Sequence, residues 1–194
     1  MNPDINAISK DLKVEITKNN ISKNFINKIQ KTYAEKPLHI YQLAIKDNNY
    51  IGSDTWRFFK DKVKDYCIDK DYRNILIILT DGYIYYKNSQ IRIGNATSYL
   101  IPELIKANKL NTSDWSEKMD TQQMEFIKAN NDLSNLEILV LGINPDPKNP
   151  FELDVIKTYW SKWFETMKVK RFEIHKAELP SEMDEIIKDF INKK

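Results

Sequence analysis

An unbroken run of apolar residues, Ile75 to Leu79, is the feature that most constrains the fold. Isoleucine and leucine fill every position of the run, whereas a strand with one face in water would alternate apolar and polar residues. Such a run is typical of a parallel strand that helices cover on both faces. We therefore predict a strand here, at the centre of a sheet.

Strand and helix patterns alternate on either side of this run. They predict strands at 12–16, 38–45, 75–79, 136–143 and 172–175, and helices at 21–33, 55–69, 99–107, 121–129, 151–167 and 181–191. Pro37 is expected to end the first helix, because the residue before a proline is pushed out of the helical region. Two short segments, 83–86 and 91–93, predict a β-hairpin after the central strand. This order favours an α/β fold, namely a doubly wound, mostly parallel sheet with helices on both faces and an inserted β-hairpin.

Length and composition favour a single domain over residues 1–194. Of the 194 residues, 41% are hydrophobic, and no stretch rich in Pro, Gly or Ser divides the chain. The 30 basic residues nearly balance the 28 acidic ones and are scattered, so we expect no nucleic-acid partner. Cys67 is the only cysteine, which excludes an intrachain disulfide and a cysteine-based metal site. No apolar stretch reaches the length of a membrane span, and we expect a cytoplasmic protein.

Side chains that carry oxygen follow several of the predicted strands. They are Asp47, Ser53, Thr55, Asp81 and Asp146. Ligands of open parallel sheets bind beyond the carboxyl ends of the strands, and a hard cation such as Mg²⁺ takes oxygen ligands. The same residue types are common in turns and helix caps, which is the alternative interpretation. Asp81 is the strongest candidate, because its charge directly follows a buried strand and needs a partner.

The segment from Ile40 to Gly82 resembles the von Willebrand factor type A domain. A strand, a Gly-Ser-Asp-Thr loop, an amphipathic helix and the sequence Ile-Leu-Ile-Ile-Leu-Thr-Asp-Gly follow one another there at the spacing of that family. Leu136 to Gly142 looks like the next strand of the family, so the resemblance covers roughly the middle and C-terminal two-thirds of the chain.

This resemblance implies a metal-ion-dependent adhesion site. Such a site holds Mg²⁺ or a similar ion, Mn²⁺ or Ca²⁺, whose open position accepts a carboxylate from a protein partner. By position, Asp81 matches the aspartate of the family, and Ser53 matches its loop threonine, with Thr55 as a shifted candidate. The resemblance therefore implies a protein-interaction module that is not an enzyme.

One motif of the family is missing from this chain. The first strand of the family ends in Asp-x-Ser-x-Ser, and this pattern occurs nowhere in the sequence. Either the metal site is degenerate and binds no ion, or the strand lies upstream of Met1 and has been lost by truncation. In the second case a strand edge is left open, with which another chain could pair to form an oligomer.

Two groups of aromatic residues add to these hypotheses. Tyr83, Tyr85 and Tyr86 lie on the predicted hairpin, where they suit a contact surface for a partner, with packing on the sheet as the alternative. Trp160, Trp163 and Phe164 recur at helical spacing, which favours a place in the core, with a partner-binding stripe as the alternative.

Two further functions are open beside the interaction module. The first is a Mg²⁺-dependent hydrolase or phosphoryl-transfer enzyme that uses Asp47, Asp81 and Asp146. The chain has only four scattered glycines and no phosphate-binding loop, which argues against the enzyme. The second is a structural relic of the family without a ligand.

Overall fold

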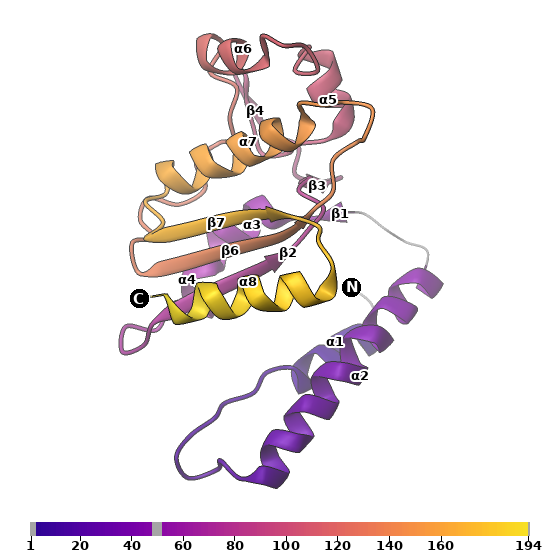
Figure 1. The fold of residues 1–194 in the computed structure, drawn as a ribbon, viewed down its shortest axis with the longest axis vertical. Helices are drawn as coiled ribbons and strands as arrows, with labels where there is room; N and C mark the ends of the chain where they lie inside the picture. Colours follow the sequence, from indigo (N-terminus) through magenta and orange to yellow (C-terminus); the bar gives the residue numbers. More distant parts are fainter. Residues whose placement is uncertain (1–2, 48–51, 194) are drawn as a thin grey trace. The chain divides into compact units, whose positions relative to one another are not determined.

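The computed structural model describes residues 3–47 and 52–193, which belong to two compact units, Met1–Ile51 and Gly52–Lys194. The first unit is a pair of helices, α1 (Pro3–Asp11) and α2 (Lys23–Asp47), shown in indigo in Figure 1. The prediction of a single domain over 1–194 stays a prediction. No helix in the described ranges is long and apolar enough to cross a membrane.

Both strands predicted in the first unit are wrong. Residues 13–17 connect the two helices without forming a strand, and residues 38–45 lie within α2, which continues through Pro37. Leu38, Tyr41 and Ile45 follow one another at spacings of three and four, so their pattern fits a helical face as well as a strand. The first strand of the segment that resembles the type A domain is therefore helical.

The second unit contains a parallel sheet of three strands, in the order β2 (Asn74–Leu79), β6 (Leu136–Ile143) and β7 (Arg171–Lys176). Asn74 pairs with Leu136, and the register continues without a break to the end of β2. The expectation that β2 lies at the centre is wrong, because β6 is the central strand and β2 is an edge strand. With no strand formed by residues 12–16 or 38–45, no other described strand pairs with the outer edge of β2.

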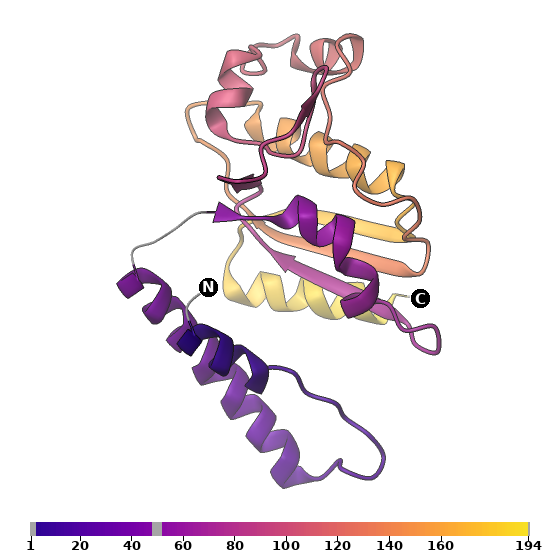
Figure 2. The same cartoon turned by 180° about the vertical axis from the view of Figure 1, so that it is seen from behind.

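Helices cover both faces of this sheet, as predicted. On one face, Ile138 and Val140 of β6 join a core with α3 (Thr55–Asp61), α4 (Val63–Cys67) and α7 (Glu152–Thr166). On the other face, Leu139 and Leu141 pack with Phe190 of α8 (Pro180–Asn192). Figure 1 shows α8 in front of the sheet, and Figure 2 shows α3 across the opposite face.

Aromatic side chains fill the core between α3 and α7. Trp160, Trp163 and Phe164 are fully buried, and Phe59 of α3 lies 4.7 Å from Trp163 between ring centroids. The indole N–H of Trp160 donates to the carbonyl of Gly82, 2.8 Å away. The prediction that this aromatic group belongs to the core is confirmed.

The chain between β2 and β6 forms smaller elements beyond the ends of the strands. They are β3 (Tyr85–Tyr86), β4 (Arg92–Ile93), β5 (Ala96–Thr97), α5 (Pro102–Ala107) and α6 (Trp115–Thr121). The predicted pairing of 83–86 with 91–93 is wrong, because β4 pairs with β5 across a turn in which Gly94 has a φ of 60°. The helix predicted at 121–129 is also wrong, since α6 ends at Thr121 and Gln123 takes a φ of 52° that breaks the helix.

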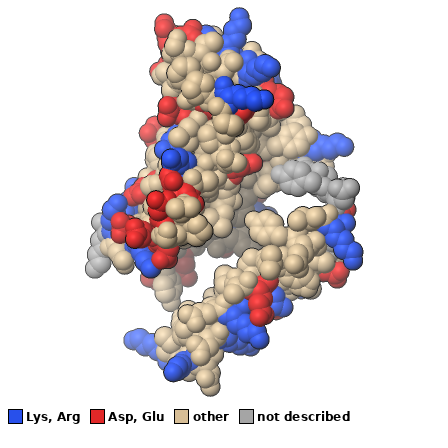
Figure 3. Space-filling view, turned by 45° about the vertical axis from the view of Figure 1, so that its right-hand side comes forward, with Lys and Arg blue, Asp and Glu red and all other residues tan. Residues whose placement is uncertain are grey.

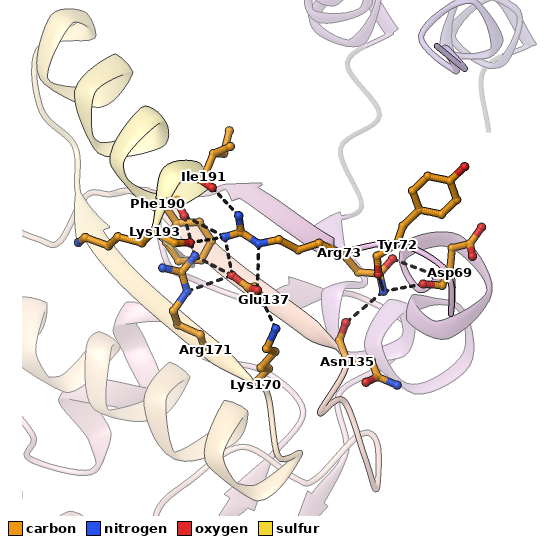
Figure 4. Close-up of polar contacts among 11 residues, drawn as sticks. Asp69, Tyr72, Arg73, Asn135, Glu137, Lys170, Arg171, Phe190, Ile191 and Lys193 are labelled. Atoms are coloured by element: carbon orange, nitrogen blue, oxygen red, sulfur yellow. Dashed lines mark hydrogen bonds and ion pairs between the residues drawn. The ribbon is translucent and has the colours of Figure 1, made fainter. Parts of the chain in front are cut away.

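A buried carboxylate ties the start of the sheet to α8. Glu137 of β6 is 4% exposed and accepts hydrogen bonds from Arg73, Lys170 and Arg171 at 2.6 to 3.2 Å. The same two guanidinium groups donate to backbone carbonyls at the end of α8, among them that of Phe190 (Figure 4). The last carbonyls of a helix have no partner within the helix. Glu137 therefore holds Arg73 and Arg171 in position to cap the C-terminus of α8.

We predict that Glu137→Ala lowers the free energy of unfolding by about 3 kcal/mol at neutral pH, because it leaves clustered cations without their anion. The hydrogen bonds from Arg73, followed by those from Lys170 and Arg171, lower the pKa of Glu137 from 4.5 to about 2. Its contribution is therefore complete above pH 4.5 and is lost as the pH falls toward 2. Urea unfolding at pH 7 and at pH 3 measures both effects. Glu173→Gln, at a partly exposed carboxylate of β7, is the matched control, and an equal loss in both variants would contradict the prediction.

Candidate functional site

A short antiparallel ribbon brings several of the predicted site residues together. β1 (Gly52–Ser53) pairs with β3, so that Gly52 lies opposite Tyr86 and Ser53 lies opposite Tyr85. Gly52 has a φ of 95°, and a Cβ atom there would lie 2.1 Å from the carbonyl oxygen of Tyr85, so only glycine fits. We call these paired residues the β1–β3 ribbon.

Asp54 and Ser89 anchor this ribbon to α3. Asp54 is the N-cap of α3, because its Oδ1 accepts from the backbone N–H of Arg57 at 3.1 Å. The buried Ser89 donates its hydroxyl to Asp54 Oδ2 at 2.8 Å and accepts from the Arg57 guanidinium at 2.7 Å. The position of Asp54 before α3 was a signal in the sequence, whereas nothing local to Ser89 or Arg57 indicated this network.

The metal ligands predicted from the sequence are only partly brought together. The hydroxyl oxygens of Ser53 and Thr55 lie 3.4 Å apart at the start of α3. Asp81 forms a turn of its own, in which Oδ1 accepts from the backbone N–H of Tyr83 at 3.1 Å. In the described part of the chain no hydrogen bond joins Asp81 to Ser53 or Thr55. The alternative interpretation, turn chemistry, therefore accounts for the observed contact of Asp81.

The carboxylates of the enzyme hypothesis occupy one helix end and two local turns. Asp47 is the last residue of α2 in the first unit and does not follow a strand. Asp146 accepts from the backbone N–H of Lys148 at 2.9 Å, in a turn like that of Asp81. Among residues 3–47 and 52–193, no group of three or more His, Cys, Asp or Glu side chains is placed to hold a metal ion.

Tyr83 differs from the two tyrosines of the ribbon. Its hydroxyl donates to Glu152 at the start of α7, and Glu152 is only 3% exposed. Burial, together with this hydrogen bond, raises the pKa of Tyr83. All three tyrosines are half-buried, but Tyr83 packs against the main core, whereas Tyr85 and Tyr86 do not belong to it.

An apolar groove runs from the ribbon along the outer edge of the sheet. Its volume is about 330 Å³, and its walls come from Ser53 to Thr55, from Phe58 and Phe59 of α3, and from Leu76 to Leu79 of β2. Leu79 is 73% exposed. In the second unit, Figure 3 shows basic and acidic side chains separated by uncharged surface on the visible face. Of the predicted site residues, Ser53 and Thr55 line the groove.

We predict no saturable Mg²⁺ or Mn²⁺ binding at millimolar concentration, because the carboxylate of Asp81 accepts a hydrogen bond within its own turn. Calorimetric titration of the full chain measures this. Asp81→Asn and Asp146→Asn form a matched pair, since each aspartate holds a similar turn. The prediction is contradicted if the wild type binds the ion saturably, Asp81→Asn abolishes this binding and Asp146→Asn retains it. That result would support an ion site at Asp81.

No protein-family model, no curated protein and no solved structure matches this chain. The resemblance to the von Willebrand factor type A domain therefore rests on the sequence motif around Asp81. What it implies for function is a proposal.

Proposed function

We propose that this chain is a protein-interaction module, without enzymatic activity, that binds a protein partner at the β1–β3 ribbon. The observation that carries the proposal is the pairing of Ser53 with Tyr85 and of Gly52 with Tyr86. It sets Tyr85 opposite Ser53, whose hydroxyl lies 3.4 Å from that of Thr55 next to an apolar groove, and Tyr86 on the other face of the ribbon. Tyrosine offers a rigid apolar ring and a polar tip, which suits a surface that must bind and release a partner.

The likeness to a doubly wound type A domain is part of this proposal. It is supported by the parallel pairing of β2 with β6 and by the turn of Thr80, Asp81 and Gly82 that follows β2. In such sheets, binding surfaces lie beyond the carboxyl ends of the strands. The ribbon directly precedes α3, whose groove reaches the end of β2, so the proposed surface lies at this end of the sheet.

The proposal is tested by recovery of the natural partner on the immobilised full chain. We expect the double variant Tyr85→Ser with Tyr86→Ser to recover at least about tenfold less partner, equivalent to about 1.4 kcal/mol of binding free energy. The control is Tyr66→Ser with Tyr72→Ser, which removes two tyrosines that are 76% and 74% exposed and lie outside the ribbon.

The readout is quantitative mass spectrometry of cross-linked partners from cells of the natural source. A partner lost equally from both double variants, or retained by both, would contradict binding at the ribbon. Thermal unfolding of each variant shows that a loss of partner is not a loss of fold.

A further inference from the structure

The outer edge of β2 carries backbone groups without a partner. The N–H of Thr80 donates to the carbonyl of Leu141 at 3.0 Å, which sets the parity of the ladder between β2 and β6. In a parallel pair, alternate residues direct both backbone groups to the same neighbour. Leu76 and Ile78 therefore face β6, whereas Ile75, Ile77 and Leu79 direct their N–H and C=O groups outward. Within residues 52–193 of the second unit, no group pairs with them.

The two edges of the sheet differ in how they are protected. β7, the other edge strand, carries charges at Arg171, Glu173 and Lys176. β2 carries no charge between Ile75 and Leu79. Proteins blunt an edge that must stay free with charged side chains, proline or a bulge, and β2 has none of these. This asymmetry indicates that β2 is an edge that becomes paired.

Apolar surface flanks this edge on both faces of the sheet. On the side of α8, Ile77 is 37% exposed and Leu79 is 73% exposed. On the side of α3, the groove of about 330 Å³ with Phe58 and Phe59 in its wall runs beside β2. A strand added here would gain hydrogen bonds from its backbone and a pocket for a side chain, the combination that recognises extended peptides.

A second copy of this chain that paired antiparallel at β2 does not suit the groove. In that arrangement the side chains it turned toward the groove would be Leu76 and Ile78. In each copy these two side chains already pack against the core of their own unit. The side chains of an extended segment that is not part of a folded core are free to enter the groove.

We propose that β2 accepts an extended, uncharged segment of a partner protein as an added strand, with one large apolar side chain in the groove beside Phe58. This inference rests on the proposed function as a protein-interaction module and names the kind of segment that is bound. The segment pairs with the outward groups of Ile75, Ile77 and Leu79, and extends the sheet to four strands.

The probe is a synthetic peptide, Lys-Thr-Val-Thr-Phe-Thr-Val-Thr-Lys, with fluorescein at its N-terminus. We expect saturable binding to the full chain by fluorescence anisotropy. Replacing the central Phe of the peptide by Ser leaves the backbone unchanged and empties the groove, so we expect at least tenfold weaker binding. Equal binding of both peptides, or no binding of either, would overturn the proposal.

Amide hydrogen exchange measured by NMR gives a residue-level readout. Without peptide, the amides of Leu76 and Ile78 exchange slowly, because they pair with β6, and those of Ile75, Ile77 and Leu79 exchange fast. Saturating peptide should slow the second group at least tenfold and leave the first group unchanged. If the amides of Ile75, Ile77 and Leu79 exchange slowly without peptide, and equally slowly at low and high protein concentration, the proposal is overturned. If their exchange slows as the protein concentration rises, the occupant of the edge is a second copy of the chain.

Two variants change the edge without touching the ladder to β6. Ile77→Pro removes one outward N–H, a change tolerated on an edge strand, and Leu79→Lys adds a charge at a side chain that is already exposed. Each variant should weaken peptide binding at least tenfold. Leu79→Lys should also keep an unfolding temperature near that of the wild type. The control is Ile93→Lys, at a side chain of β4 that is 64% exposed, which should bind as the wild type does.

The same variants separate this inference from the proposed function. If Leu79→Lys recovers the natural partner in full while the ribbon double variant loses it, strand addition is overturned and the interaction module stands. If the ribbon double variant keeps the partner and Leu79→Lys loses it, the ribbon is overturned and strand addition stands.

Discussion

The central strand β6 is the constraint on which the rest of the second unit depends. Its side chains are buried on both faces, and both of its edges are paired, with β2 on one side and β7 on the other. Because its residues alternate between two cores, α7 and α8 must lie on opposite faces of the sheet. Glu137 brings a charge into this strand, and the two arginines that bind it also cap the end of α8.

The unequal edges of the sheet connect the fold to its proposed role. A sheet of three parallel strands has two edges, and only the edge at β7 carries charges that discourage pairing. The groove beside α3 lies along the other edge and shares Ser53 with the β1–β3 ribbon. A partner bound in the groove would therefore lie next to β1.

Most helices and strands of the second unit could be predicted from the hydrophobic pattern, whereas the order in which the strands pair could not. The strands at 75–79, 136–143 and 172–175 and the helices at 151–167 and 181–191 are present within a few residues of their predicted ends. The segment 38–45 was mistaken because its spacing fits a helix as well as a strand, and the helix continues through Pro37. For the candidate site, Ser53 and Thr55 do lie close together, but Asp81 uses its carboxylate in a local turn.

The sequence by itself determined that the segment 136–143 is buried, because a strand so rich in apolar residues does not remain in water. It also determined that α7 turns its tryptophans inward, through their helical spacing. Only the tertiary structure decided that β6 is central, that β2 is an edge, that Tyr85 lies beside Ser53 and that Glu137 meets two arginines. The reason is that a buried segment must have apolar side chains, which the sequence shows. The hydrogen bonds between distant strands join backbone groups, which are the same for nearly every residue type.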